Sequence, residues 1–239
     1  MSISNVAQDL TPAGLNELSQ APTTEVRTPG YFSRADLSEL NQRFANAAPS
    51  EIMRFAIESA DRPVVFTNFR PRAVAFLNLV TQVRPQIPVI WVDHGYNTAA
   101  SYRFVETLIH KLDLNLHVYT SQVTAARRDA IWGEIPALDT PEHDRFSREV
   151  KLEPFERALR EWQPDIWLNG IRRHQTEHRK TLDIFTTGAQ HTVRVAPMFH
   201  LSELDVEEYI YEQGLPDNDD YFDPTKGEEH RECGLLLAR

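Results

Sequence analysis

The sequence predicts an α/β fold with a doubly wound, mostly parallel sheet. Three observations favour it: apolar strands alternate with amphipathic helices, the composition is that of a globular domain, and polar residues directly follow the strands. The 239 residues are 41% hydrophobic and 25% charged, with a formal net charge of −10. A chain of this length can bury one sizeable core, and no Gly/Ser-rich linker divides it, so we expect one folding unit.

The chain begins with a polar, proline-punctuated stretch and two helices. Residues 1–35 are expected to form an N-terminal arm, residues 36–211 a single α/β domain, and residues 212–239 an acidic C-terminal segment that carries the only cysteine. Apolar residues recur at three- and four-residue spacing over 37–47 and again over 52–56. This periodicity predicts two helices before the first strand.

The central part of the chain alternates strands with helices. Short apolar runs bounded by breakers predict strands at 63–67, 88–92 and 114–119. Pro71 suits the first turn of the helix that follows the first strand, and residues 98–112 predict the next helix. Strand, helix and strand at this spacing imply right-handed parallel crossovers.

The second half of the chain is less regular. Residues 120–150 are polar and predict either a mobile loop or a helix pair over the sheet. Periodicity predicts a helix at 155–162, and apolar runs predict strands at 165–170 and 193–198.

The negative charge is confined to the C-terminal part of the chain. Residues 203–229, named here the acidic segment, contain eleven acids and one base, Lys226, so they account for the whole net charge. A helix predicted at 201–211 begins the segment, with Ser202 as its N-cap and Asp205 in the capping-box position. The acidic balance argues against non-specific binding of nucleic acid.

Composition also limits the expected location and cofactors. The longest apolar runs are far shorter than the roughly 18 residues of a membrane helix, and the N-terminus lacks a basic-then-apolar signal pattern. We therefore expect a cytoplasmic protein without membrane contact. Cys233 is the only cysteine, so the chain forms no intramolecular disulfide and cannot by itself supply a four-cysteine iron–sulfur or zinc site.

Three polar stretches follow predicted strands, at residues 67–72, 93–96 and 170–175. Ligands of open parallel sheets bind beyond the C-terminal ends of the strands, so we expect the three stretches to converge on one cleft. Arg70 and Arg72 lie at a predicted helix N-terminus, where an anion is favoured. A solvated pair of arginines is the alternative.

Other polar residues also allow two interpretations. Asp93 either accepts a hydrogen bond from a ribose or an amine, or caps the next helix. Six basic or potentially basic side chains lie between Arg172 and Lys180, and guanidinium forks match phosphate and sulfate oxygens; a solvated basic turn is the alternative. Arg231 next to Cys233 favours the reactive thiolate, whereas most lone cysteines are buried and inert.

Four segments share their order and residue pattern with one known family. They are residues 84–96, which end in Asp93-His94-Gly95-Tyr96; Lys151-Leu152-Glu153-Pro154; Gly170-Ile171-Arg172-Arg173-His174-Gln175 with Arg179; and Arg231-Glu232-Cys233-Gly234-Leu235. Together they resemble the motifs of the 3′-phosphoadenylyl-sulfate (PAPS) reductase family, over roughly residues 60–235. Related reductases that use adenylyl sulfate carry extra cysteines for an iron–sulfur cluster, so a single cysteine favours the PAPS branch.

The resemblance implies an adenine-nucleotide α-hydrolase-like Rossmannoid fold and thioredoxin-dependent reduction of PAPS to sulfite and adenosine 3′,5′-bisphosphate. It makes Cys233 the nucleophile, which becomes an S-sulfonate. No bound cofactor and no iron–sulfur cluster are implied, since reduced thioredoxin or glutaredoxin donates the electrons, and the family precedent implies a homodimer. The residues expected to bind PAPS or a related adenine nucleotide are Arg70, Arg72, Asp93, Lys151, Arg172, Arg173, Arg179 and Arg231.

Departures from the family pattern keep other functions open. The Ser-rich phosphate loop of the family is here residues 67–72, without glycine; His94 replaces a threonine, and Leu236 replaces the usual histidine. One alternative is a divergent nucleotide-binding or regulatory protein of the same fold, and another is an enzyme acting on another sulfo- or adenylyl-nucleotide. A further hypothesis is that the acidic segment docks on the basic cleft and carries Cys233 in and out; a solvated acidic helix is its alternative.

Overall fold

A six-stranded sheet forms the centre of residues 31–226, the part of the chain that the computed structural model describes. Its strands are β1 (Pro63–Thr67), β2 (Pro88–Asp93), β3 (Asn115–Thr120), β4 (Ile166–Leu168), β5 (Phe185–Thr187) and β6 (Val193–Val195). They stand in the order β3-β2-β1-β4-β6-β5; β5 runs antiparallel to β6, and the other pairs are parallel. The doubly wound, mostly parallel sheet is therefore confirmed, with its order reversing between β1 and β4.

β1 occupies the middle of the sheet because its side chains are apolar on both faces. Val64, Val65 and Phe66 are buried, as expected for a strand covered from both sides. Val65 stands opposite Val89 of β2 and, on the other side, opposite Leu168 of β4. The apolar rows of neighbouring strands thus join into one continuous core layer.

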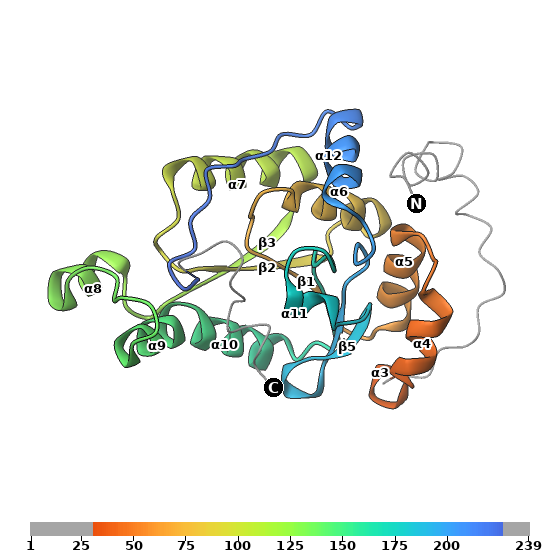
Figure 1. Cartoon of the computed structure of the whole chain (residues 1–239), viewed down its shortest axis with the longest axis horizontal. Helices are drawn as coiled ribbons and strands as arrows, with labels where there is room; N and C mark the ends of the chain where they lie inside the picture. Colours follow the sequence, from red (N-terminus) through yellow and green to blue (C-terminus); the bar gives the residue numbers. More distant parts are fainter. Residues whose placement is uncertain (1–30, 227–239) are drawn as a thin grey trace.

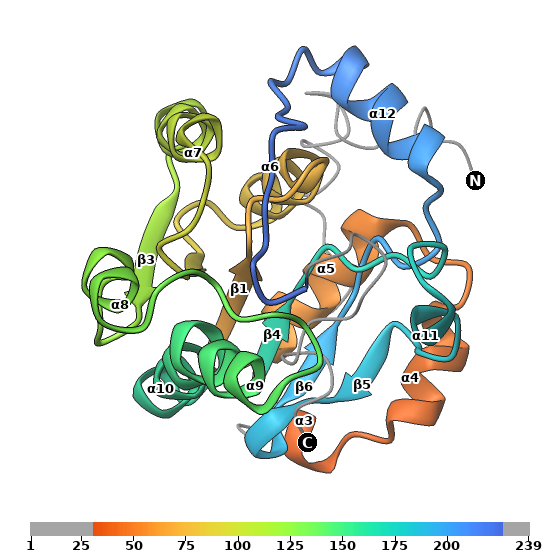
Figure 2. The ribbon, with the colours of Figure 1, turned by 60° about the vertical axis from the view of Figure 1, so that its left-hand side comes forward.

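Helices cover both faces of the sheet (Figures 1 and 2). One core is shared by α4 (Leu37–Phe44), α5 (Pro49–Ser59), α6 (Ala73–Val83), α7 (Ala99–Leu112) and α12 (Glu203–Glu212). A second core lies against α10 (Glu153–Trp162). Figure 1 shows α9 (Pro141–Ser147) and α8 (Ala125–Trp132) to the left of α10. The alternation along β1 divides the two cores, because Val65 joins the first while Val64 and Phe66 join the second.

Most of the predicted helices are confirmed. The two helices expected before the first strand are α4 and α5. Of the two alternatives for residues 120–150, a mobile loop or a helix pair, the structure has the helix pair, α8 and α9. Thr98 caps α7 by accepting a hydrogen bond from the backbone N–H of Ser101. Ser202 and Asp205 form the expected capping box at the start of α12.

The prediction that Pro71 lies in the first turn of α6 is wrong. The helix begins at Ala73, and Arg72 before it has φ 69° and ψ 0°. Phe69 also has a positive φ, of 49°. Left-handed residues do not belong to a right-handed helix, so Pro71 lies in a turn, which the hydrogen bond from Ala73 N to Arg70 O closes at 3.0 Å.

Several short elements differ from the predicted boundaries. β4 ends at Leu168 rather than at residue 170, because the carbonyl of the Asn169 side chain accepts a hydrogen bond from Ile171 N at 3.0 Å and turns the chain. β6 ends at Val195 rather than at residue 198. Elements that the sequence pattern missed are β5, the π-helix η1 (Arg148–Leu152), α11 (Glu177–Lys180) and the 3-10 helix η2 (Ala189–His191).

Most of the predicted N-terminal arm lies outside the described residues. Its last part forms a short helix, α3 (Tyr31–Arg34), and Phe32 is buried in the first core. None of the helices in the described range 31–226 is both long enough and apolar enough to span a bilayer.

Candidate active site

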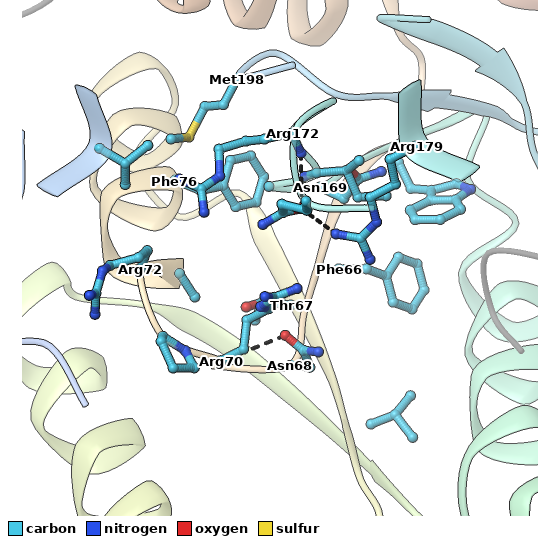
Figure 3. Close-up of a pocket in the computed structure, with 18 of the residues that line it drawn as sticks. Phe66, Thr67, Asn68, Arg70, Arg72, Phe76, Asn169, Arg172, Arg179 and Met198 are labelled. Carbon is cyan, nitrogen blue, oxygen red and sulfur yellow. Dashed lines mark hydrogen bonds between the residues drawn. The ribbon is translucent and has the colours of Figure 1, made fainter. Parts of the chain in front are cut away.

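A pocket lies at the carboxyl ends of β1 and β4, where the strand order reverses (Figure 3). Doubly wound sheets bind their ligands at this point. Its cationic lining residues are Arg70, Arg72, Lys151, Arg172, Arg179 and Lys226, and its apolar walls include Phe66, Phe76, Val92, Trp167 and Met198. Within the described residues, no carboxylate lines the pocket. The pocket therefore offers positive charge beside apolar surface.

The loop after β1 is shaped by left-handed residues rather than by glycines. Phe69 is buried and packs edge-on against Trp91, with ring centroids 5.3 Å apart. Thr67 Oγ1 accepts a hydrogen bond from Phe69 N at 3.2 Å, and Asn68 Oδ1 accepts one from Arg70 N at 3.4 Å. These contacts fix the turn that sets Arg70 into the pocket.

The two predicted arginines of this loop have different surroundings. Arg70 is half-buried in the pocket and, within residues 31–226, its guanidinium makes no hydrogen bond or ion pair. Arg72 contributes to the pocket wall, but its guanidinium contacts carboxylates of the acidic segment. Of these two arginines, Arg70 is therefore the one available to an anionic ligand.

The basic stretch after β4 places two guanidinium groups in the pocket. Arg172 and Arg179 are buried, and the Gln175 side-chain oxygen accepts hydrogen bonds from Arg172 N and from the Arg179 guanidinium. Glu203 Oε2 lies 2.5 Å from Arg172 Nη2. Burial lowers the pKa of Arg172 from its ordinary value of 12.5, and Glu203 opposes this shift. The Arg172 guanidinium still stays charged at neutral pH, as a site for phosphate or sulfate requires.

Gly170 allows this stretch to approach α6 closely. A Cβ atom at position 170 would lie 3.2 Å from Phe76 Cβ and 3.3 Å from Phe76 Cγ. Such contacts are tighter than ordinary van der Waals contact, so a side chain here would push the loop away from the helix. Glycine therefore fixes the width of the pocket between β4 and α6.

Lys151 is held at the pocket by the π-helix η1 and is buried. Its ammonium contacts the Asp223 carboxylate and lies 3.1 Å from Thr225 Oγ1. Burial alone would raise the pKa of Asp223, but the charge and the hydrogen bond of Lys151 hold that pKa well below its usual range. The described end of the acidic segment is thereby fastened to the pocket floor by a buried ion pair.

His94 is a neutral, buried neighbour of this pair. Burial lowers its pKa to about 4, against the opposing charge of Asp223. Its Nδ1 accepts a hydrogen bond from the backbone N–H of Tyr96 at 3.1 Å. At neutral pH the imidazole therefore packs as an uncharged group.

Two predicted ligand residues do not line the pocket. Asp93 Oδ1 accepts hydrogen bonds from Gly95 N at 2.9 Å, from Asn97 Nδ2 at 2.8 Å and from Tyr102 Oη at 3.0 Å, so its own turn and α7 take up the carboxylate. Arg173 packs its guanidinium over the Phe199 ring, 5.8 Å from the centroid.

The expected convergence is therefore correct for the stretches after β1 and β4 and wrong for the stretch after β2, from which only the strand residue Val92 reaches the described pocket. The predicted nucleophile Cys233 and its neighbour Arg231 lie outside the described residues.

Asn169 and Lys226 line the pocket and were missed as site residues. Asn169 is 6% exposed, and its Nδ2 is buried without a hydrogen-bond partner in the described residues. The amide orientation is fixed, because Ile171 N must donate to the side-chain oxygen. The signal for Asn169 was a polar residue directly after an apolar strand, one position before the stretch that we singled out.

The described residues hold no group of three or more His, Cys, Asp or Glu that could bind a metal ion.

A family model described as the phosphoadenosine phosphosulfate reductase domain matches residues 62–223, which is more than half of the chain. The chain belongs to this family. Curated PAPS reductases are similar along most of their length: the enzyme of Synechococcus sp. is 36% identical over 182 residues (75% of this chain, 78% of the relative), and that of Synechocystis sp. is 35% identical over 188 residues (77% and 75%).

Solved structures agree with the PAPS reductase fold. The phosphate complex of the PAPS reductase from Candida auris has a TM-score of 0.68 at 20% identity and covers 76% of this chain and 87% of that chain. FMN adenylyltransferase from Candida glabrata in complex with ATP has a TM-score of 0.53 at 13% identity, with 90% and 65% covered. At these identities the likeness shows the fold alone, and the expected Rossmannoid α/β fold is confirmed.

Proposed function

We propose that the chain reduces PAPS to sulfite and adenosine 3′,5′-bisphosphate, with electrons from reduced thioredoxin or glutaredoxin. The observation that carries this proposal is the pocket, in which six cations meet apolar walls and to which no described carboxylate contributes. PAPS has two phosphate groups and a sulfate for the cations, and an adenine for the apolar walls. The pocket thus complements both the charged groups and the base of the nucleotide.

Within this pocket we assign Arg70, Arg172 and Arg179 to the phosphate and sulfate oxygens. Asn169 Nδ2 adds an uncharged donor beside them. For Lys151 the substrate contact stays a prediction, because Asp223 contacts its ammonium.

The predicted substrate contacts of the other residues also stay predictions. Asp93 and Arg173 are turned toward other partners. Arg231 lies outside the described residues.

Cys233 supplies the chemistry in two steps. Its thiolate attacks the sulfate sulfur, an S–S bond forms, and the S–O bond to the phosphate breaks, so that adenosine 3′,5′-bisphosphate leaves with the electron pair. A thiolate of the donor then attacks Cys233 Sγ, sulfite leaves, and the second thiol of the donor resolves the mixed disulfide. The donor dithiol supplies both electrons and becomes a disulfide, so the proposal needs no bound cofactor.

The position of the acidic segment supports a role for Cys233 at this pocket. Lys226 lines the pocket and precedes Cys233 by seven residues. Seven extended residues span at most about 25 Å, so the length of this stretch allows the thiol to reach the ligand.

We further propose that the protein is a homodimer in the cytoplasm and has no nucleic-acid or membrane partner. The family precedent supports the homodimer, and the acidic composition argues against nucleic acid.

Sulfite release from PAPS with reduced thioredoxin tests the proposal. We expect wild-type protein to release sulfite and Cys233→Ser to bind adenosine 3′,5′-bisphosphate with unchanged affinity but to release none. Titration with PAPS, adenylyl sulfate, ATP and adenosine 3′,5′-bisphosphate ranks the ligands. A preference for ATP over PAPS, without sulfite release, would refute the reductase proposal.

One observation favours a nucleotide-binding protein without reductase activity as the second candidate. The loop after β1 has no glycine, and one of its two arginines is taken up by carboxylates. This candidate predicts tight nucleotide binding with no modification of Cys233. An enzyme acting on another sulfo- or adenylyl-nucleotide would instead show turnover with that nucleotide in the same titration series.

A further inference from the structure

The two arginines of the loop after β1 point in different directions (Figure 3). Arg70 lies beside Thr67 at the pocket, whereas Arg72 extends away from the side chains gathered around Asn169. Positive φ angles at Phe69 and Arg72 turn the backbone on both sides of the Arg70-Pro71 pair. The two charges, which are equivalent in the sequence pattern, therefore have different environments.

Arg72 contacts carboxylates from two parts of the acidic segment. From α12, Glu207 Oε1 lies 2.7 Å from Nη2 and Glu203 Oε1 lies 3.5 Å from Nε. From the following loop, Asp217 Oδ2 and Asp219 Oδ1 lie 2.7 and 2.6 Å from Nη1. Partial burial alone would lower the pKa of Arg72, but Glu207, Asp219 and Asp217 raise it above its ordinary value. Any ligand anion would have to compete with four carboxylates for this guanidinium.

Asp217 is the best placed of these carboxylates. Its side chain is 17% exposed, and its Oδ1 also accepts the backbone N–H of Arg72 at 3.0 Å. Asp219 is 80% exposed, and a single exposed ion pair contributes little to stability. The planar guanidinium suits this arrangement because its several N–H donors serve more than one carboxylate at once.

The acidic segment is fastened at two further points after Arg72. The carbonyl oxygen of Asp220 accepts hydrogen bonds from the hydroxyls of Thr98 at 3.0 Å and Ser101 at 2.8 Å, at the start of α7. Asp223 contacts the buried Lys151 at the pocket. Figure 2 shows this part of the chain returning from α12 past α6 toward β1 and β4. The segment that leads to Cys233 is thus guided to the pocket, and the contacts of Arg72 with Asp217 and Asp219 precede these two points along the loop after α12.

We propose that Arg72 is a positioning residue that clasps the acidic segment to the loop after β1 and thereby sets the approach of Cys233, while Arg70 binds the ligand. The inference rests on the proposed function for the ligand and for the thiol. It assigns separate tasks to two arginines that stand two positions apart. Arg72 acts through Asp217 and α12, and it does not touch the reacting atoms.

Arg72→Gln and Arg70→Gln form a matched pair for the test. Three quantities are measured on the reduced full-length chain: hydrogen exchange of residues 203–226, the Kd of adenosine 3′,5′-bisphosphate, and the rate of S-sulfonate formation on Cys233 with saturating PAPS. For Arg72→Gln we expect exchange of this segment at least tenfold faster and sulfonation at least tenfold slower, with Kd unchanged within twofold. For Arg70→Gln we expect Kd at least tenfold higher and unchanged exchange.

Asp217→Asn is the second variant, because it removes the partner charge and leaves the loop arginines intact. It should reproduce the exchange and sulfonation changes of Arg72→Gln, and the double variant should add little to either single one. If the effects of Arg72→Gln and Asp217→Asn on exchange and sulfonation were additive in the double variant, the proposed role of the Arg72–Asp217 contact would be refuted. Unchanged exchange in Arg72→Gln, or a loss of nucleotide affinity as large as that of Arg70→Gln, would also refute it.

Failure of the clasp and failure of the proposed function give different results. If wild-type protein shows no sulfonation, the proposed chemistry fails, and the exchange measurements on Arg72→Gln and Asp217→Asn still decide whether Arg72 holds the segment. If sulfonation occurs at the same rate in wild type and Arg72→Gln, the reductase proposal stands and the positioning role of Arg72 is refuted.

Discussion

The buried amide nitrogen of Asn169 indicates a binding site for an anion. Its Nδ2 is buried without a partner in the described residues, next to Arg172 and Arg179 in the lining of the pocket. A buried donor left unpaired costs about 1–3 kcal/mol, and an oxygen of a bound phosphate or sulfate would remove that cost. This amide therefore complements an anionic ligand without adding charge.

Asn169→Asp tests this role. The carboxylate keeps an acceptor for Ile171 N but replaces the donor with a negative oxygen. We expect the Kd of adenosine 3′,5′-bisphosphate, measured by calorimetry, to rise at least tenfold, while the melting temperature stays within a few degrees because nearby arginines neutralise the new charge. The affinity should recover partly as the pH is lowered and the carboxyl takes up a proton. Unchanged affinity would show that the amide makes no ligand contact.

His94 predicts a pH dependence of stability. Its pKa is about 4 in the folded chain and 6.5 for the ordinary side chain, so between these values the unfolded state binds more protons than the folded state. The free energy of unfolding must therefore fall as the pH falls from about 7 to 4, by up to about 3 kcal/mol from this group. The ion pair of Asp223 adds to this slope only below about pH 5, where the carboxyl begins to take up protons in the unfolded state, because its pKa is lower in the folded chain.

Urea unfolding at several pH values measures this effect. His94→Asn keeps an acceptor near Tyr96 N and removes the titrating group, so its stability should depend less on pH between 7 and 4. Part of the slope should remain, because burial also lowers the pKa of His200. The same slope in wild type and variant would contradict the assignment to His94.

At the scale of elements, the sequence predicted most accurately the strands whose position depends on burial alone. β1, β2 and β3 are within one residue of the expected runs, because apolar strands between helices carry a strong local signal. β5 was missed because three residues carry little pattern. Its position depends on a distant partner, since Asn41 Nδ2 donates to Phe185 O and Asn41 Oδ1 accepts from Phe185 N.

For the candidate site, the sequence predicted residues that directly follow strands but not their contacts with distant parts of the chain. Arg70, Arg172 and Arg179 follow from the rule that parallel strands present ligand residues at their carboxyl ends. The partners of Arg72 do not follow, because Glu207 and Asp217 lie more than 130 residues further along the chain. The start of α6 was misplaced for a local reason: positive φ at non-glycine residues leaves no clear mark in the sequence.

The packing of the segment after β4 against α6 gives a prediction at this scale. In Gly170→Ala the new Cβ would lie 3.2 Å from Phe76 Cβ, so the segment must shift. We expect the free energy of unfolding to fall by about 1–3 kcal/mol and the nucleotide Kd to rise, because Arg172 and Asn169 move with the segment. Denaturant unfolding and calorimetry measure both. If Gly170→Ala had the Kd and the free energy of unfolding of the wild type, α6 would have moved aside without any loss of stability, and the prediction would be wrong.

At the scale of the whole molecule, the uneven charge is an arrangement of two complementary parts. The acidic segment contains the whole formal net charge of −10, and its carboxylates contact Arg72, Arg172 and Lys151 around the pocket. The hypothesis that the segment docks on the basic cleft agrees with these contacts. Glu203, at the start of α12, remains largely exposed, so the alternative of a solvated acidic helix describes the outer side of α12.

The most direct test of the account is the covalent state of Cys233 after contact with PAPS. Reduced full-length protein is incubated with PAPS in the absence of thioredoxin and analysed by intact-mass spectrometry and peptide mapping, with Cys233→Ser as control. We expect the mass of one sulfonate group on Cys233, which reduced thioredoxin removes with release of sulfite. A chain that binds PAPS, has a demonstrably reduced thiol and gains no sulfonate would contradict it.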